Sequence, residues 1–147
     1  MNNIAMNIVA IPDIAGPVDD AATENEVLAI SEMSELFGVT LRTLRFYEEK
    51  GLLHPVRRGA RRFYGSRDVG RMRVILQAKK IGLTLAEIRR VIKLVESETP
   101  KADQYRELQG ICQAQQEMLH EQKTLLDEQV TEVDNVLAAL NKLVAGN

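Results

Sequence analysis

The feature that most constrains this chain is a long C-terminal stretch with a seven-residue apolar repeat. From about Asp103 to Ala145 there is no proline, and the only glycine is Gly110. Such a stretch predicts a continuous helix about 60 Å long, with the seam of a coiled coil along one side. A helix with one apolar stripe cannot stand alone in water, so a second copy of the chain is the expected partner. The predicted dimerisation residues are Ile111, Cys112, Met118, Leu119, Leu125, Leu126, Val133, Val136 and Leu140.

The charged residues are distributed unevenly, although the whole chain carries a net charge of only −2. Residues 1–30 hold five acidic residues and no Lys or Arg. Residues 31–93 hold 15 basic and 6 acidic residues, a net charge of +9, whereas residues 94–147 hold 4 basic and 10 acidic residues, a net charge of −6. A block this basic inside an acidic chain indicates a polyanion ligand. Charge alone leaves a solvated basic face as an equal alternative.

The N-terminal residues 1–27 are predicted to be a flexible arm. Pro12, Gly16 and Pro17 interrupt any helix there. A disordered tail is the favoured interpretation, and docking of the apolar segment Ile4–Ile11 on this protein or a partner is the alternative. Residues 28–96 are predicted to form a DNA-binding domain, and residues 101–145 the dimerisation helix.

Two short helices open the predicted domain. Ser31 is a candidate N-cap for a helix that runs through Phe37, and Gly38 would end it. Thr40 would cap a second helix that runs to Lys50. Because only two or three residues separate them, the pair has the spacing of a helix-turn-helix.

Two further helices follow a basic hairpin. Ser66 is the candidate cap of the third helix, and Thr84 with Glu87 forms a capping-box pattern for the fourth. Between the second and third helices, Leu53–Tyr64 is predicted to be a β-hairpin wing that turns at Gly59, with an irregular basic loop as the alternative. The basic residues of its tip are Arg57, Arg58, Arg61 and Arg62.

The second helix has two different faces when it is projected at 100° per residue. Leu41, Leu44 and Tyr47 fall on one arc, and Arg42, Arg45, Phe46 and Glu49 fall on the opposite arc. Arginine can bond both acceptors of a guanine edge or clamp a phosphate, and an α-helix fits the major groove. The wing arginines would track phosphates or enter a minor groove. For Tyr64, a hydroxyl bond to a phosphate and burial under the wing are equally favoured.

These motifs resemble the MerR family of bacterial transcription regulators. The resemblance is carried by the run LAISEMSELFGVTLRTLRFYEEKGLL, and it continues in RRFYGSRDVGRMRVILQAKKIGLTLAEIRRVI. It implies a mainly α fold, a winged helix-turn-helix with a small β-hairpin wing followed by a long antiparallel coiled-coil dimerisation helix. It also implies that Arg42 and Arg45 face the groove and that Arg62 and Tyr64 touch the DNA backbone. The predicted DNA-contacting residues are Thr40, Arg42, Thr43, Arg45, Phe46, Tyr47, Arg57, Arg58, Arg61, Arg62 and Tyr64.

Two positions depart from the family pattern. The first residue of the aromatic pair is usually Tyr and is Phe46 here, which removes one possible phosphate hydrogen bond. In the wing, Arg61 stands where the family commonly has an aromatic residue, which exchanges packing for charge.

The sequence has none of the motifs that would indicate an enzyme. We find no glycine-rich phosphate loop, nucleophile elbow or metal-ligand cluster, and Cys112 lies in line with leucines as a core thiol would. We therefore expect no catalytic residues, cofactor or metal. With one cysteine, no secretory signal and no membrane span, the expected location is the bacterial cytoplasm, at the nucleoid.

The expected function is that of a homodimeric, sequence-specific transcription regulator. It would bind a pseudo-palindromic promoter site in double-stranded DNA and, as the resemblance implies, bend and untwist it to control RNA polymerase. Two alternatives are a coiled-coil adaptor whose basic head binds protein, and an architectural DNA-binding protein without sequence preference.

Overall fold

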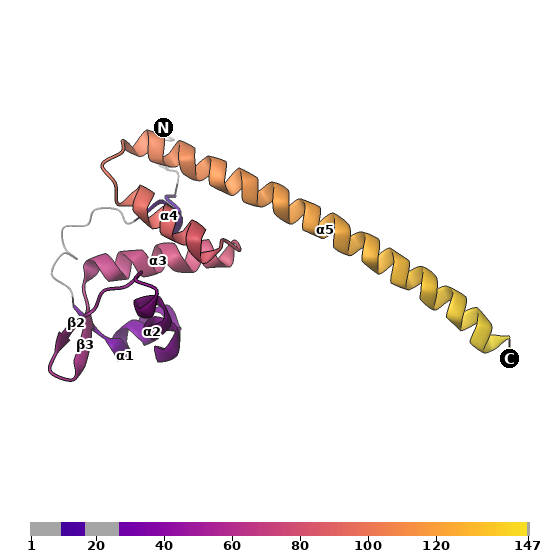
Figure 1. The fold of residues 1–147 in the computed structure, drawn as a ribbon, viewed down its shortest axis with the longest axis horizontal. Helices are drawn as coiled ribbons and strands as arrows, with labels where there is room; N and C mark the ends of the chain where they lie inside the picture. The colour runs from indigo at the N-terminus through magenta and orange to yellow at the C-terminus, as the bar shows by residue number, and fades with distance from the viewer. Residues whose placement is uncertain (1–9, 17–26, 147) are drawn as a thin grey trace, which may run out of the picture. The chain divides into compact units, whose positions relative to one another are not determined.

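The computed structural model describes residues 10–16 and 27–146, and the chain divides into two units, residues 1–108 and residues 109–147. Its mainly helical architecture with a small wing confirms the predicted fold class. In chain order the elements are η2 (Asp13–Ala15), β1 (Leu28–Ala29), α1 (Ile30–Phe37), α2 (Leu41–Glu49), β2 (Val56–Arg58), β3 (Arg61–Tyr64), α3 (Ser66–Lys80), α4 (Leu85–Val95) and α5 (Lys101–Ala145) (Figure 1).

The predicted helix-turn-helix is formed by α1 and α2. Gly38 ends α1 with φ of 63°, a left-handed conformation that favours glycine. Thr40 caps α2 by accepting the N–H of Thr43 at 3.1 Å, as predicted. The predicted cap Ser31 is wrong, because α1 begins at Ile30 and its N-cap is Ala29, two residues before Ser31. Glu32 accepts the Ala29 N–H there at 3.0 Å.

The predicted wing is a hairpin of β2 and β3, and β3 is the central strand of a three-stranded antiparallel sheet in the order β1-β3-β2. Arg58 pairs with Arg61 across a two-residue turn. Gly59 has φ of 64° and Ala60 has no positive φ, which is the sign pattern of a type II′ turn. The short strand β1 was not predicted; its Leu28 pairs with Tyr64, so that the wing is anchored to the start of α1.

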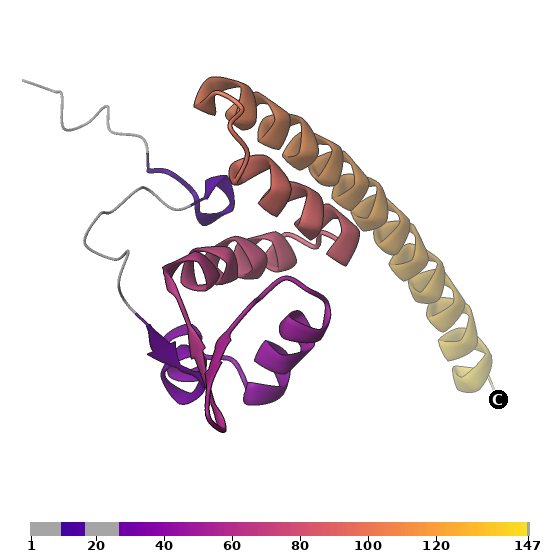
Figure 2. The same ribbon diagram turned by 60° about the vertical axis from the view of Figure 1, so that its left-hand side comes forward.

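Helix α3 lies between the helix-turn-helix and α4 (Figure 2). Gly65, not the predicted Ser66, is its N-cap residue. The predicted capping box of α4 is present, because Thr84 accepts the Glu87 N–H at 3.3 Å and Glu87 accepts the Thr84 N–H at 2.9 Å. The largest fully buried side chains of the first unit are Tyr64, Met33, Leu44, Leu53, Met72, Ile75, Gln104, Val74 and Val91.

Part of the predicted flexible arm is packed on the domain. Ile14 and Ala15 in η2 are buried, and the Ile14 N–H donates to Gln77 Oε1 on α3 at 2.7 Å. A Cβ added to Gly16 would lie 3.2 Å from the Cβ of Val95 on α4. The disordered-tail interpretation is therefore wrong for residues 13–16. Of the segment predicted to dock, Ile4–Ile11, residues 4–9 lie outside the described residues, and residues 10 and 11 are exposed.

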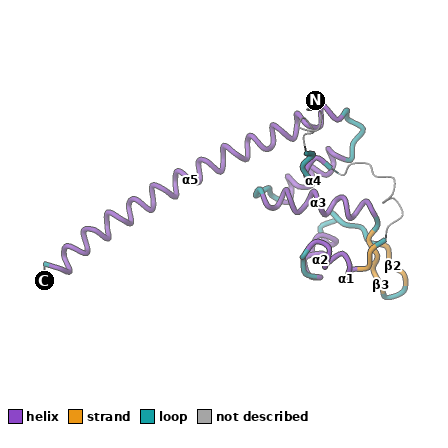
Figure 3. The backbone as a smooth tube through the Cα atoms, turned by 180° about the vertical axis from the view of Figure 1, so that it is seen from behind, coloured by secondary structure: helices purple, strands orange, loops and turns teal. Residues whose placement is uncertain are grey.

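Helix α5 starts within the first unit and continues through the second as one helix to Ala145 (Figure 3). Its start is fixed by Gln104, whose Nε2 donates to the carbonyl oxygens of Ser97 at 3.3 Å and Thr99 at 2.8 Å. Within residues 10–16 and 27–146, none of the helices combines the length and the apolar character that crossing a membrane requires.

Candidate nucleic-acid interface

Helix α2 presents two arginines outward. Arg42 and Arg45 are exposed, whereas Leu44 and Tyr47 on the opposite arc are buried, with 0% and 3% of their surfaces accessible. The two faces of the projected helix are therefore correct for these residues. Leu41, the first residue of the helix, lies on the predicted apolar arc but is half-exposed. Tyr47, also in the predicted DNA-contacting set, packs mainly in the core, and its DNA contact stays a prediction.

The N-terminal turn of α2 carries two threonines from the predicted DNA-contacting set. Thr40 is exposed and Thr43 is half-buried. Their Oγ1 atoms lie 3.0 Å apart, and Thr40 Oγ1 also accepts the Thr43 N–H. This cap orders the end of α2 whose unpaired N–H groups favour an anion.

Phe46 lies on the outer face of α2, as the projection predicts, with 44% of its surface exposed. Its ring packs edge to face against Tyr47 at a centroid distance of 5.4 Å, and Lys50 Nζ lies 5.6 Å from its centroid. These contacts hold an apolar ring at the surface beside Arg42 and Arg45. Without a hydroxyl, Phe46 can offer a base or sugar an apolar contact only.

Two hollows flank α2. The one toward the wing, which we name the wing-side hollow, has a volume of about 610 Å³ and is lined by Ala29, Ile30, Ser31, Arg45, Arg57, Gly59, Ala60, Arg61 and Arg62. The other, the α4-side hollow, has a volume of about 480 Å³ and is lined by Arg42, Thr43, Phe46, Tyr47, Lys79, Leu83, Leu85 and Ile88. Cationic side chains thus line the surface on both sides of α2.

The wing contributes most of these cations. Arg57, Arg58 and Arg61 are exposed, and the guanidinium of Arg58 lies 5.9 Å from the ring centroid of Phe63. The structure brings Arg57 and Arg61 into the same hollow as Arg45, as a common binding surface requires. Arg58 lines neither of the two hollows.

Arg62 and Tyr64 have surroundings that the sequence did not reveal. Arg62 Nε lies 3.5 Å from Glu48 Oε1 on α2, a partner that sequence reasoning missed. Tyr64 is completely buried, so the alternative of burial under the wing is the correct one and the predicted phosphate contact is wrong. Burial raises the pKa of the Tyr64 hydroxyl, and the nearby Glu48 carboxylate adds to this rise.

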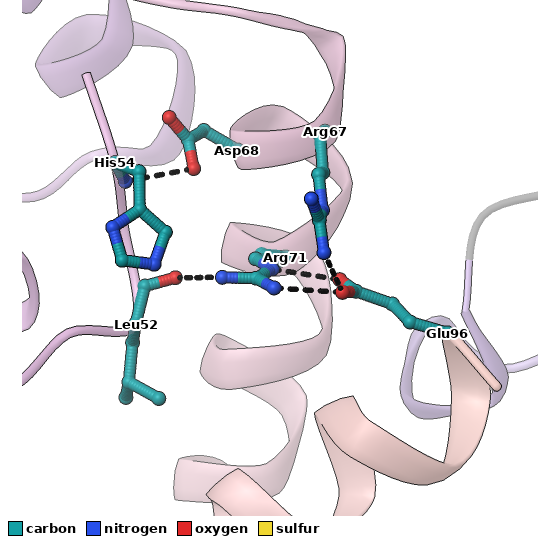
Figure 4. Close-up of polar contacts among 6 residues, drawn as sticks. All are labelled: Leu52, His54, Arg67, Asp68, Arg71 and Glu96. Atoms are coloured by element: carbon teal, nitrogen blue, oxygen red, sulfur yellow. Dashed lines mark hydrogen bonds and ion pairs between the residues drawn. The ribbon is translucent and has the colours of Figure 1, made fainter.

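An ion-pair network holds α3 against α4 (Figure 4). Arg71 donates to both carboxylate oxygens of Glu96 at 2.7 Å and to the Leu52 carbonyl oxygen at 3.1 Å, and Arg67 also bonds Glu96 at 2.8 Å. Burial alone would raise the pKa of Glu96, but its hydrogen bonds with Arg71 and Arg67 hold it below the ordinary value. Arg71 is therefore part of the framework of the domain, with 12% of its side-chain surface exposed.

Two more contacts connect the helix-turn-helix to this frame. The His54 N–H donates to Asp68 Oδ1 on α3 at 3.1 Å, and burial raises the pKa of Asp68 despite this bond. Arg89 on α4 donates to the Lys50 carbonyl oxygen at 2.7 Å, at the C-terminal end of α2. A cation at the C-terminal end of a helix interacts favourably with the helix dipole and stabilises the helix. The N-terminal end of α2, at Thr40, belongs to the candidate interface.

The predicted dimerisation residues lie along α5, and most are exposed in the single chain. Ile111 and Cys112 are half-buried. The exposed members are Met118, Leu119, Leu125, Leu126, Val133, Val136 and Leu140. Three further apolar residues, which are not in the predicted set, are also exposed and follow the repeat leucine or valine at i+4: Val130, Leu137 and Val144. In the described part of the chain, no three His, Cys, Asp or Glu side chains are grouped as a metal site requires.

Comparison with known proteins places this geometry in a family. The family model described as "MerR HTH family regulatory protein" matches residues 28–94, and "MerR, DNA binding" matches residues 69–143. The chain is 30% identical over 114 residues to the HTH-type transcriptional activator mta of Bacillus subtilis, covering 76% of this chain and 41% of that protein. It is 38% identical over 71 residues to the mercuric resistance operon regulatory protein of Serratia marcescens, covering 47% of this chain and 49% of the relative. The chain thus spans less than half the length of these two relatives.

Solved structures agree with this assignment. The N-terminal part of the B. subtilis multidrug transporter activator, MtaN, superimposes with a TM-score of 0.56 at 26% identity, covering 75% of this chain and 97% of that one. HiNmlR, described as a MerR family regulator lacking the sensor domain and bound to promoter DNA, shares the fold with a TM-score of 0.50 at 23% identity, covering 69% and 80%. The chain belongs to the MerR family of helix-turn-helix regulatory proteins.

Proposed function

We propose that this protein is a homodimeric transcription regulator that reads a pseudo-palindromic promoter site through two copies of α2. The observation that carries the proposal is the pair of cation-lined hollows on either side of an exposed Arg42–Arg45 helix face. A helix in the major groove lies between two phosphate backbones, so it needs positive charge on both of its sides. Here Arg57, Arg61 and Arg62 supply that charge toward the wing, and Lys79 supplies it toward α4.

The dimer is proposed from the apolar stripe of α5. Leu119, Leu126, Val133 and Leu140 recur every seven residues and are about half exposed in the single chain. Burying each such side chain against a second helix contributes about 1–2 kcal/mol. A self-pairing helix would fix the separation and orientation of two recognition helices, as a two-fold operator requires.

Control of RNA polymerase is proposed through DNA deformation. Two rigidly connected heads impose their own spacing and twist on the duplex, and the energy of this deformation depends on the sequence. By analogy with the family, the protein would bend and untwist its promoter so that polymerase can use it. A gel-shift assay with circularly permuted promoter fragments would test DNA bending, and in vitro transcription would separately test the effect on RNA polymerase.

A salt titration tests DNA binding against the adaptor alternative. With roughly eight phosphates contacted by a dimer, log affinity should fall against log salt concentration with a slope near −7. The measurement is fluorescence anisotropy of a duplex selected from fragmented genomic DNA, with random duplex as competitor. A flat salt response would favour the adaptor, and equal affinity for selected and random duplex would favour an architectural protein.

A single arginine tests sequence reading. Arg45→Ala should cost about 1–3 kcal/mol of binding free energy at one base position of the selected site. Arg73→Ala is the matched control, because Arg73 is exposed on α3 and lines neither hollow. An equal loss on every duplex would show that Arg45 contacts phosphate and not a base.

A further inference from the structure

Helix α2 and the wing are in contact through a group of side chains that includes one carboxylate, and we call this contact the α2–wing seam. Glu48 on α2 pairs with Arg62 on β3, and both side chains are mostly buried, with 22% and 23% of their surfaces exposed. Glu49, the next residue on the same helix, is exposed. The chain thus offers two adjacent carboxylates, one in the seam and one in solvent.

The geometry of the pair leaves part of Arg62 available. Glu48 Oε1 faces Nε, the guanidinium nitrogen nearest the main chain, at 3.5 Å. A guanidinium is a rigid planar fork, so fixing Nε also fixes the direction of its two terminal nitrogens. Arg62 lines the wing-side hollow together with Arg45. A second acceptor in that hollow could therefore be bonded by a guanidinium that is already oriented.

The α2–wing seam contains two buried polar atoms that do not contribute hydrogen bonds to stability. Glu48 Oε2 and the Tyr64 hydroxyl are both buried, and neither has a hydrogen-bond partner among the described residues. Burial raises the pKa of Tyr64, and the Glu48 charge adds to this, so the two groups are close enough to interact. Buried polar groups without partners cost stability. A carboxylate kept at this cost suggests a role other than stabilisation.

We infer that Glu48 is a positioning residue for DNA binding, which holds Arg62 so that its terminal nitrogens bond a phosphate in the wing-side hollow. The inference rests on the proposed function, because the phosphate is that of the bound duplex. Without Glu48, the arginine would have to be ordered when DNA binds. Ordering one long side chain lowers affinity by about two- to tenfold.

An opposing effect must be separated from this one. Removing any carboxylate near DNA weakens the repulsion of phosphates and should raise affinity. Glu49→Gln measures this general effect, because it removes the same charge from the same helix outside the seam. We expect Glu49→Gln to bind as the wild type does or more tightly, and Glu48→Gln to bind about two- to tenfold more weakly than Glu49→Gln.

A double-mutant cycle completes the test. In an Arg62→Gln background the difference between Glu48→Gln and Glu49→Gln should vanish, because the side chain to be positioned is gone. Thermal unfolding of each variant gives a separate readout. A stability change for Glu48→Gln without a matching loss of DNA affinity would assign Glu48 a purely structural role and overturn the inference.

Two outcomes distinguish this inference from the proposed function. If wild-type protein binds the selected duplex but the Glu48 and Glu49 variants behave alike, the positioning role is wrong and the proposed function stands. If wild-type protein binds no duplex in preference to a neutral polymer, the proposed function itself fails.

Discussion

In the first unit Leu44, Leu53 and Ile75 are completely buried, whereas Leu119 and Leu126 on the distal part of α5 are 45% and 60% exposed. Both regions are helical and contain similar apolar residues. The difference is that the first unit surrounds its leucines with several short elements, while residues 109–145 belong to a single helix whose leucines and valines are exposed. The first unit therefore buries its own leucines, and the exposed leucines of the distal helix are available to the second copy that we propose.

The largest expected effect tests this need for a partner. Leu126→Asp should dissociate the dimer, because it places two charges in an apolar seam and removes two buried leucines, a loss of at least about 3–6 kcal/mol per dimer. Sedimentation velocity over a concentration series measures it. Asn135→Asp introduces the same side chain on the same helix away from the stripe and should leave the dimer intact. A wild-type monomer at every concentration would contradict the proposed pairing.

The next effect concerns the self-contained unit. Leu44→Ala should lower the free energy of unfolding by about 2–5 kcal/mol, because it leaves a cavity in the core between α2 and its neighbours. Leu41→Ala, three residues earlier on the same helix and half-exposed, should cost much less. Urea unfolding of both variants provides the measurement. Similar losses for the two leucines would contradict the difference in burial between Leu44 and Leu41.

A smaller effect depends on pH. The pKa of Glu96 is lowered in the folded state, so its contribution to stability is present above its unfolded value and is lost as pH falls through the folded value. Glu96→Gln should lower the free energy of unfolding by about 1–2 kcal/mol at pH 7, and it should remove the pH dependence that Glu96 contributes. Melting temperatures between pH 7 and pH 3 would show whether the curves of wild type and variant converge in acid.

Asp68 contributes a pH dependence of stability that is opposite in sign to that of Glu96. Burial raises its pKa in the folded state, so falling pH favours folding at this residue. This opposing contribution is common to wild-type protein and Glu96→Gln, and it cancels in their difference. Parallel curves at all pH values would contradict the assigned role of Glu96.

The smallest effect compares one residue type in the two units. Thr84→Ala should lower the free energy of unfolding by about 1 kcal/mol, because it removes the hydroxyl that caps α4. Thr131→Ala, in the middle of α5, removes only a bond to the carbonyl oxygen of Asp127 in the same helix and should be within about 0.5 kcal/mol of wild type. Differential scanning calorimetry can resolve the two. An equal loss would show that capping is not what Thr84 contributes.

Local chemistry was sufficient to predict the helices and the wing. The caps at Thr40 and Thr84 and the turns at Gly38 and Gly59 depend on residues within four positions of each other, so the sequence reveals them directly. The predicted caps Ser31 and Ser66 lie two residues and one residue after the actual caps, because Ala29 and Gly65 already have the extended backbone of a cap.

Long-range contacts were not predictable in this way. The strand β1 has two residues and exists only because Leu28 pairs with Tyr64, 36 positions later. The packing of Ile14 on Gln77 and the burial of Tyr64 likewise depend on distant surfaces. The Glu48–Arg62 pair could have been suspected only from opposite charges on α2 and the wing, a signal shared by many other pairs.

The contacts of Arg71 have a consequence for how this sequence can vary. One guanidinium bonds the chain after α2 through the Leu52 carbonyl oxygen and also bonds both oxygens of Glu96, the C-cap residue of α4. A lysine would conserve the formal charge, yet a single ammonium cannot reach in three fixed directions from one plane. A charge-conserving exchange at this position would therefore break this connection between the chain after α2 and α4, and leave only the bond from Arg89 to the Lys50 carbonyl oxygen among those described above, although an alignment would score it as a mild change.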